Sequence, residues 1–422
     1  MEIFVQILVV LVLARLFGEA AERLGQSASV GELLAGIALA LAGLYLAPLT
    51  PWLSGLAELQ ESAVLAHLGT LGIFFLVLMA GIEMQPKEIA ETSKAAFLVA
   101  LGGMLVPLAA GCGLGWLILP EGPLKVPQAL VIGVAMSITA IPATVKVLSE
   151  FDLLHSKLGE TVVAAAVFDD VFGLFLLAVV TAVVQTGSLP DLASALWLLG
   201  KIALFFAVTI ALGVHIYPRV SRGLKQMQAD ALELSALVIA ALAYGLLAEL
   251  LGMHWILGAF VAGLYFESAR VGEAAYRDIR VTVAAITGGV LGPFFFVSIG
   301  LTVELEAIAA VPLVLGALIV LAFAGKALGA GLAARLAGLP GPAALAVGVG
   351  MTSRGAIELV VLSVAYEAGV FAVADGDAAI VRYLFSALVI MALANTFLMP
   401  LALRAVLRRQ GPDAPSRGDD ES

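Results

Sequence analysis

Two adjacent aspartates, Asp169 and Asp170, interrupt the apolar segment 157–185. In a membrane-spanning helix they would lie about 13 residues, or about 20 Å, from the start of the segment. An ionisable side chain at such a depth costs about 2.5 to 3.5 kcal/mol on insertion scales, which makes it a functional candidate. Neighbouring residues point about 100° apart on a helix, so the two carboxylates need different partners. We expect an ion or proton site here, because a structural ion pair would account for only one aspartate.

A single lysine, Lys326, lies in the apolar segment 308–336. It stands about ten residues, or about 15 Å, from the end of its segment, which is too deep for its ammonium group to reach water easily. Lys326 therefore needs a buried partner, and one of the two aspartates is the natural choice. A buried lysine can lose its proton when its partner is neutralised, but a permanent salt bridge remains the alternative. The surrounding sequence lacks the glycine spacing of a phosphate-binding loop.

Two further segments contain helix-breaking sequences. In the first, Pro142 follows Ser137 and Thr139 and removes a helical hydrogen bond. In the second, the glycine-rich stretch 348–355 contains Arg354. Corresponding breaks in two halves of a chain are typical of transporter binding sites. We expect Arg354 to compensate the negative ends of the half helices and the aspartates to compensate the positive ends.

Composition decides the class of protein that holds these residues. The 422-residue chain is 62% hydrophobic and 13% charged, against about 25% charged residues in soluble proteins. Its apolar excess must face lipid, which predicts an all-α polytopic membrane protein. A net charge of −10 and scattered basic residues exclude nucleic-acid binders, and soluble enzymes are excluded as well. One cysteine, Cys112, excludes an internal disulfide, and four widely separated histidines argue against a zinc site.

Polar interruptions divide the chain into about 13 segments of the length that crosses a bilayer. They run over residues 3–23, 28–48, 62–83, 91–119, 126–150, 157–185, 191–217, 230–250, 254–268, 281–302, 308–336, 341–369 and 378–407. The first has neither a basic start nor a cleavage site, so we expect a retained span. With the N-terminus outside and the C-terminus cytoplasmic, most of the 22 lysines and arginines fall on the inner side. Glu32, Glu233, Glu249 and Lys201 lie nearer segment ends, where we expect interfacial positions.

Two pairs of segments resemble each other. Residues 30–36 are similar to 257–263, and residues 74–77 are similar to 294–297. An odd number of spans separates each pair, so the copies enter the membrane from opposite sides. We therefore expect inverted six-helix repeats, with the span at 191–217 as a linker helix.

The stretches 168–174, 293–301, 325–329 and 350–355 resemble the second monovalent cation:proton antiporter family, and the aspartate pair with Lys326 is most similar to its NapA-type sodium/proton antiporters. The resemblance implies an NhaA/NapA-like fold with crossed, broken helices. It also implies a homodimer, with a core domain over 91–185 and 308–407 and a dimerisation domain over 1–83 and 230–302. By position, Asp170 would be the main cation and proton carboxylate, Asp169 the partner of Lys326, and Thr139 a contributor at the first break.

Two departures from the family matter. Its Arg-Gly-Glu sequence becomes Arg354-Gly355-Ala356, which leaves Glu358, one turn later, as a substitute. The potassium efflux relatives carry a Gln-Asp pair and a cytosolic nucleotide-binding domain, and we expect neither here. Beyond the antiporter domain at 1–407, residues 408–422 are expected to form a short disordered cytoplasmic tail.

We interpret the chain as a secondary antiporter of the inner cell membrane that exchanges sodium for protons, with no cofactor. Sodium prefers hard oxygen ligands, and the candidate ligands are Asp170, Asp169, Thr139 and Ser137. A carboxylate cannot hold a cation and a proton together, so competition for Asp170 would couple their exchange. Potassium/proton exchange at the same residues stays open, and a cation channel is the alternative from another class. An intramembrane aspartyl protease is disfavoured, because its Gly-x-Gly-Asp pattern is absent.

Overall fold

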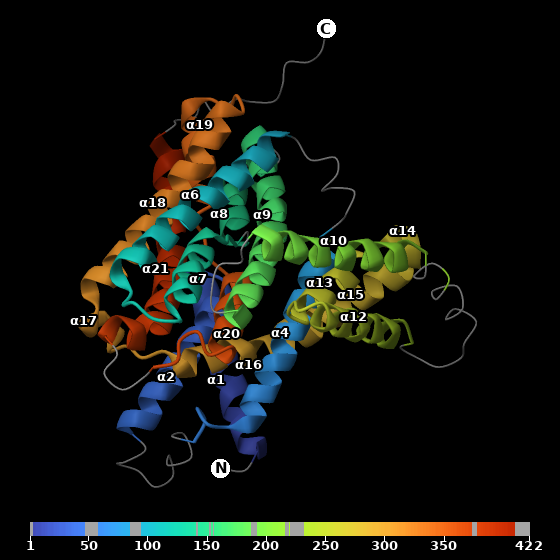
Figure 1. Ribbon diagram of the computed structural model, residues 1–422, viewed down its shortest axis with the longest axis horizontal. Coiled ribbons are helices and arrows are strands. Elements are labelled where there is room, and N and C mark those ends of the chain that lie inside the picture. Colours follow the sequence, from blue (N-terminus) through green and yellow to red (C-terminus); the bar gives the residue numbers. More distant parts are fainter. Residues whose placement is uncertain are drawn as a thin grey trace. The chain divides into compact units, whose positions relative to one another are not determined.

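The computed structural model describes residues 3–46, 58–84, 94–140, 142–151, 153–154, 156–186, 192–215, 219, 232–373 and 378–409. Every regular element in these residues is helical, as the composition predicts (Figure 1). The first half contains α1 (Ile3–Arg23), α2 (Ala28–Tyr45), α4 (Ala63–Glu83), α6 (Lys94–Ile118), α7 (Lys125–Ser137), α8 (Pro142–Glu150), α9 (Lys157–Thr186) and α10 (Leu192–His215). The second contains α12 (Leu232–Leu250), α13 (Ile256–Leu264), α14 (Ser268–Val271), α15 (Glu273–Ile286), the π-helical turn η3 (Thr287–Leu291), α16 (Gly292–Thr302), α17 (Ala307–Ala310), α18 (Pro312–Leu336), α19 (Gly341–Gly350), α20 (Ala356–Glu367) and α21 (Ala379–Arg409).

Each of the predicted spans contains a helix or consecutive shorter helices. Among the described residues, nine helices are long and apolar enough to cross a membrane. The count of 13 stays a prediction, because broken and short helices such as α13 fall below that length. One boundary is wrong: the segment expected to begin at residue 281 is helical from Glu273, through α15, η3 and α16. The predicted tail lies outside the described residues from residue 410 onward.

The chain divides into two compact units. Unit 1 comprises residues 1–88 and 181–303, and unit 2 comprises residues 89–180 and 304–422. Each unit therefore joins an early and a late part of the sequence. The expected roles of these parts, dimerisation for the first and ion transport for the second, stay predictions.

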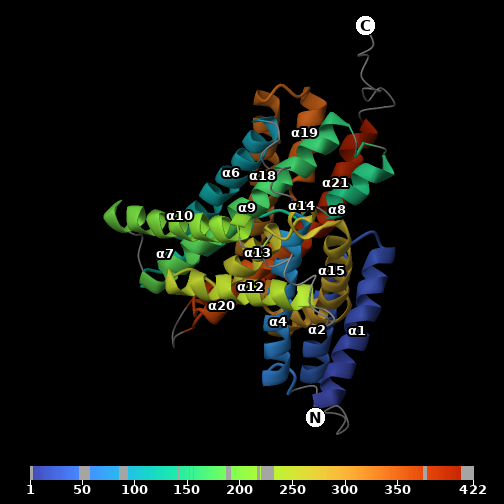
Figure 2. The same cartoon turned by 90° about the vertical axis from the view of Figure 1, so that its right-hand side faces the viewer.

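In unit 1 the same kind of close helix crossing occurs twice. Helix α2 packs against α16 where a Cβ on Gly300 would lie 2.8 Å from the Cα of Gly36. Helix α13 packs against α4 where a Cβ on Gly81 would lie 3.1 Å from the Cα of Gly263. These four helices contain the two pairs of similar segments. In each of the two crossings, a helix of the first repeat packs against a helix of the second repeat. Figures 1 and 2 show α1 lying alongside α2 in this unit.

Glu32 has a partner within the protein, while its expected interfacial depth stays a prediction. Its side chain is buried, and Oε1 lies 3.5 Å from Nη1 of Arg15 on α1. Arg15 also donates to the carbonyl of Gly288 in η3 at 2.8 Å. Helix position alone did not reveal this neighbour. Of the other expected interfacial residues, Glu249 is exposed, and Glu233 and Lys201 are half-buried.

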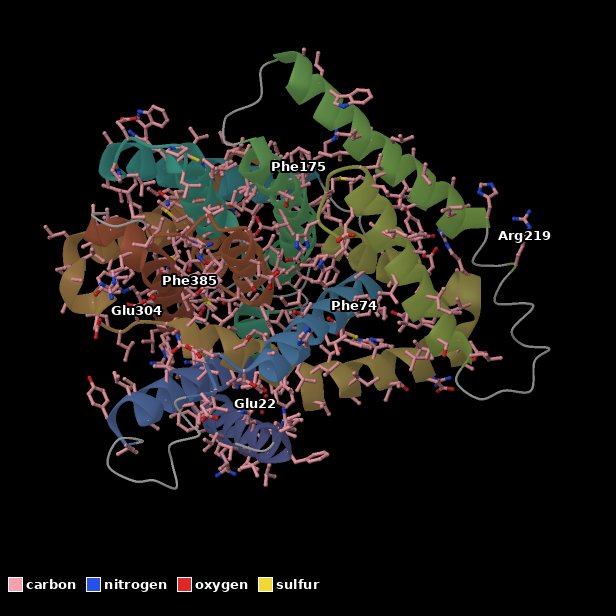
Figure 3. All side chains as sticks on the ribbon, turned by 60° about the horizontal axis from the view of Figure 1, so that its bottom comes forward. Glu22, Phe74, Phe175, Arg219, Glu304 and Phe385 are labelled. Atoms are coloured by element: carbon pink, nitrogen blue, oxygen red, sulfur yellow. The ribbon has the colours of Figure 1, made fainter. Side chains whose placement is uncertain are left out.

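In unit 2, α18 packs along α6 and also contacts α19 and α21. Glycines let these helices approach closely, since a Cβ on Gly102 of α6 would lie 2.8 Å from the Cβ of Ala333 on α18. Helix α7 packs on α6 in the same way, at Gly111 and Gly133. On α21, Phe385 packs against Tyr366 of α20 with ring centroids 4.9 Å apart (Figure 3). Helices α7 and α18 thus pack on α6, α18 and α20 pack on α21, and α20 also contacts α7.

The glycine crossing of unit 1 can be tested with Gly300→Ala. The new methyl group would overlap the backbone of α2, which cannot move as a flexible side chain would, so we expect a loss of about 1–3 kcal/mol and a lower melting temperature in detergent. Gly316→Ala on α18 is the matched control, because a Cβ there meets nothing within 4 Å. An equal melting temperature for the two variants would show that the crossing tolerates a side chain.

Candidate functional site

The first break lies between α7 and α8 and has a local cause. Pro142 cannot donate an N–H, so the carbonyl of Ile138, four residues earlier, loses its helical donor. Ile138 is extended, with φ −78° and ψ 145°, and ends α7. The last carbonyls of a helix need donors from elsewhere, and here they are buried within unit 2.

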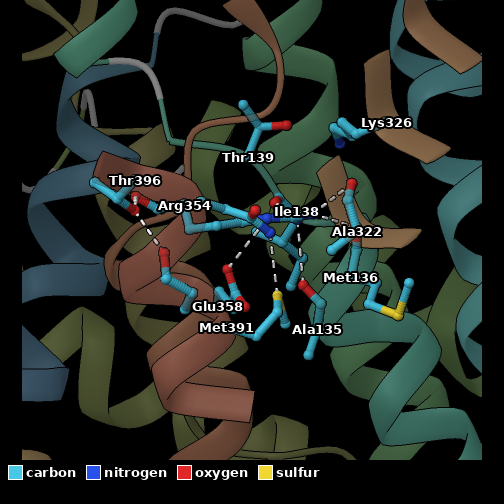
Figure 4. Close-up of polar contacts among 12 residues, drawn as sticks. Ala135, Met136, Ile138, Thr139, Ala322, Lys326, Arg354, Glu358, Met391 and Thr396 are labelled. Carbon is cyan, nitrogen blue, oxygen red and sulfur yellow. Dashed lines mark hydrogen bonds and ion pairs between the residues drawn. The ribbon is translucent and has the colours of Figure 1, made fainter. Parts of the chain in front are cut away.

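Two cationic side chains supply these donors, and Figure 4 shows the contacts of one of them, Arg354. Arg354 donates to the carbonyls of Ala135 at 3.3 Å, Met136 at 2.7 Å and Ile138. Lys326 donates to the carbonyl of Ser137. Four successive carbonyls at the negative end of α7 are thus bound by two cations, which is the arrangement that the helix dipole favours. The carbonyl before them, of Val134, accepts the hydroxyl of Ser137 at 2.8 Å.

The second break lies between α19 and α20, and hydroxyl groups satisfy its carbonyls. Thr144 donates to the carbonyl of Gly350 at 2.6 Å, and Thr139 donates to that of Met351 at 3.0 Å. The backbone N–H of Ala140 also donates to the carbonyl of Ser353 at 2.9 Å. The two broken segments therefore hold each other directly. The second break receives hydroxyl donors from the first segment, and the first break receives Arg354 from the second segment and Lys326 from α18.

Close contact between the two broken segments at this crossing depends on one glycine, Gly355. A Cβ on Gly355 would overlap the Cβ of Ala140. The two non-helical backbone segments can approach each other this closely only because position 355 has no side chain.

Lys326 is paired with Asp169 of α9, as the sequence predicts. Its Nζ lies 2.8 Å from Oδ1 and 3.0 Å from Oδ2 of Asp169, and both side chains are buried. The ammonium group is therefore shared between a carboxylate and the carbonyl of Ser137. Because this carbonyl ends α7, the ion pair and the helix end share one proton donor.

Asp170 follows on the same helix and is half-buried, whereas Asp169 is 1% exposed. Because the two side chains point about 100° apart, Asp170 lies on a different face of α9 from the one on which Asp169 contacts Lys326. The two adjacent carboxylates thus have different environments, as expected. Asp169 lies in a buried ion pair, and Asp170 is more accessible.

Arg354 has a second buried neighbour, Glu358. Its Nε lies 3.8 Å from Oε2 of Glu358, and both side chains are fully buried. Arg354 also donates to the carbonyl of Ala322 on α18 at 3.2 Å. The charges of Arg354, Glu358, Lys326 and Asp169 interact with one another. Arg354 therefore interacts both with Glu358, the expected substitute for the family's glutamate, and with the carbonyls at the end of α7.

One expected role of the aspartates is wrong in part. Asp169 does not compensate a positive helix end but pairs with Lys326. In the first turn of α20 the acidic residue is Glu358. Pro142 is the first residue of α8, and its side chain lies outside the described residues.

Two threonines of the site were missed from the sequence. Thr144 lies one turn beyond the first break, and Thr396 on α21 donates to the carbonyls of Arg354 at 3.1 Å and Ala392 at 2.8 Å. The pair Asn395-Thr396 stands in a long apolar span, and this polar interruption was a usable signal. Thr144 gave none, since threonine is common in such helices.

The chemistry available here is that of hard oxygen donors. In the described part of the chain, no group of three or more His, Cys, Asp or Glu side chains could hold a metal ion. Carboxylate, hydroxyl and backbone carbonyl oxygens are present instead, next to a lysine. This set suits a weakly held monovalent cation and a proton.

Comparison with known proteins agrees with this geometry. The chain is 28% identical over 405 residues to the Na⁺/H⁺-K⁺ antiporter GerN of Bacillus cereus, covering 96% of each chain. It is 27% identical to a Na⁺/H⁺ antiporter of Enterococcus hirae, covering 95% of this chain and 97% of that one.

The fold is that of a solved sodium proton antiporter, MjNhaP1 of Methanocaldococcus jannaschii. The TM-score is 0.69 at 17% identity, covering 97% of this chain and 98% of that one. A family model described as "sodium/hydrogen exchanger, transmembrane" matches residues 8–409. The resemblance predicted from the aspartate pair and Lys326 is thereby confirmed, and the chain belongs to the sodium/hydrogen exchanger family.

Proposed function

We propose that this integral membrane protein exchanges a monovalent cation, sodium in the first place, for protons at a site built on Asp170. The observation that carries the proposal is the position of Lys326, which binds both Asp169 and the end of the broken helix α7. A cation that binds the neighbouring Asp170 therefore lies close to a lysine that can exchange one of its two partners for the other.

Exchange follows from competition for one carboxylate. Asp170 holds either a cation or a proton, and the hydroxyl oxygens of Thr139 and Ser137 retain lone pairs that can serve as further ligands. When a cation occupies Asp170, Lys326 is displaced from Asp169 and can release its proton. When a proton replaces the cation on Asp170, Lys326 regains its own proton and pairs with Asp169 again, so two protons are bound for each cation released. Movement of unit 2 then carries the site between the two membrane faces.

This cycle moves two protons for one sodium ion and therefore one net charge. The membrane potential contributes about 2.3 kcal/mol per elementary charge at 100 mV, so it drives such exchange strongly. Potassium is the second candidate cation, since the relative GerN is named for both sodium and potassium. A cation channel is disfavoured, because the relatives of this chain reported above are named as antiporters.

The assembly is proposed from the same resemblance. Unit 1 would form a homodimer interface, and unit 2 would be the moving core. The chain would lie in the inner cell membrane with its N-terminus outside and its C-terminus cytoplasmic. The fit of the basic residues to this orientation supports it.

The transport function is tested with purified protein in proteoliposomes. We expect proton flux on addition of sodium to the wild type, saturable in sodium, and a comparison with lithium and potassium gives the selectivity. Asp170→Asn keeps the shape of the side chain and loses its charge, so exchange of every cation should disappear while the protein stays folded. Substantial cation-dependent proton flux in this variant would contradict the site. Continuous current without saturable exchange would contradict antiport itself.

The proton role of Lys326 is tested with Lys326→Gln on a solid-supported membrane. If Lys326 carries a proton, exchange should persist in this variant with little or no charge movement, because one proton fewer then moves per sodium. Undiminished current alongside surviving exchange would leave Lys326 as a structural partner of Asp169 only. Total loss of exchange is separated from unfolding by the melting temperature.

A further inference from the structure

Glu358 is a buried carboxylate with an unusual set of neighbours. It lies in the first turn of α20 and is fully buried. Neither Oε1 nor Oε2 accepts a hydrogen bond from the described residues. Burial of an ionised carboxylate without hydrogen bonds is unfavourable unless a nearby opposite charge compensates it. The one ion pair it makes in these residues is with Arg354, at 3.8 Å.

The geometry of Arg354 explains what this carboxylate does. The two terminal nitrogens of the guanidinium group are occupied by carbonyls of α7 and by that of Ala322. Its remaining nitrogen, Nε, makes no hydrogen bond in the described part of the chain and faces Glu358. Carbonyls contribute only partial charges, so they cannot neutralise the full positive charge of arginine. Glu358 supplies the full negative charge on the other edge of the group.

The balance of charge makes this neutralisation important for ion binding. Asp169 and Lys326 form one buried pair, and Arg354 and Glu358 form the other. Both cations bind the same turn of α7, which leads directly into Thr139. With Glu358 neutral or absent, a full positive charge would remain at the end of α7, next to the proposed cation ligands.

We propose that Glu358 is a positioning residue that offsets the charge of Arg354 and fixes it on the end of α7, and that it thereby sets the affinity of the site for its cation. The proposal rests on the transport function proposed above. It adds a determinant that touches neither the cation nor Asp170.

The test measures sodium-dependent proton flux in proteoliposomes for the wild type, Glu358→Gln and Glu358→Asp. A unit charge at about 10 Å and an effective dielectric constant of about 20 changes an affinity about tenfold. We therefore expect Glu358→Gln to raise the KM for sodium by about tenfold with the maximal rate kept within about twofold, the pattern of lost binding. Glu358→Asp keeps the charge and should restore the KM. Glu32→Gln is the matched control, because Glu32 is a buried carboxylate paired with arginine in unit 1, and its KM should equal that of the wild type.

An unchanged KM in Glu358→Gln, or the same rise in Glu32→Gln, would overturn the proposal. A lower maximal rate with an unchanged KM would also overturn it. If Glu358→Gln does not fold, Glu358→Asp decides, because it keeps the negative charge beside Arg354 and should fold with the KM of the wild type. A KM raised about tenfold in Glu358→Asp, or loss of its fold, would refute compensation by charge. Absence of exchange in the wild type would instead refute the transport function.

Discussion

The end of helix α7 in the interior of unit 2 is the constraint on which the site depends. Pro142 stops the helix, and four successive carbonyls then need donors in the buried interior of unit 2. Arg354 and Lys326 provide them from two other segments of the chain. A broken helix is thereby converted into a fixed, negatively polarised end with two cations on it. The rest of the charge network compensates those cations.

The two cations differ in what they can do. Arginine stays charged in proteins, and its planar group can bind several carbonyls at once. Lysine is a point charge that can lose its proton when buried. Arg354 therefore suits a permanent bond between the crossed segments, and Lys326 suits a partner that changes its state. The carboxylate partners of the two cations also differ. Lys326 donates a hydrogen bond to Asp169, whereas Glu358 interacts with Arg354 only through charge.

Hydropathy and proline positions predicted the helices well, because both act locally along the chain. The sequence also predicted that Asp169 or Asp170 pairs with Lys326, since a buried charge must be matched and few candidates exist. It did not predict that Arg354 and Lys326 share one helix end, because this depends on how α6 and α18 pack α7 against them. The pairing of Glu32 with Arg15 is not predictable for a similar reason, because Arg15 lies on a neighbouring helix. Thr139 was chosen for its place at the break, but its bond to Met351 required the crossing itself.

In the proposed cycle, Lys326 couples two protons to one sodium ion. The most direct measurement is the reversal potential of exchange by the wild-type protein in proteoliposomes, with equal pH on both sides. Exchange of two protons for one sodium ion predicts that a tenfold sodium gradient is balanced by a membrane potential of about 59 mV. Exchange that no membrane potential can balance would be electroneutral and would contradict the account.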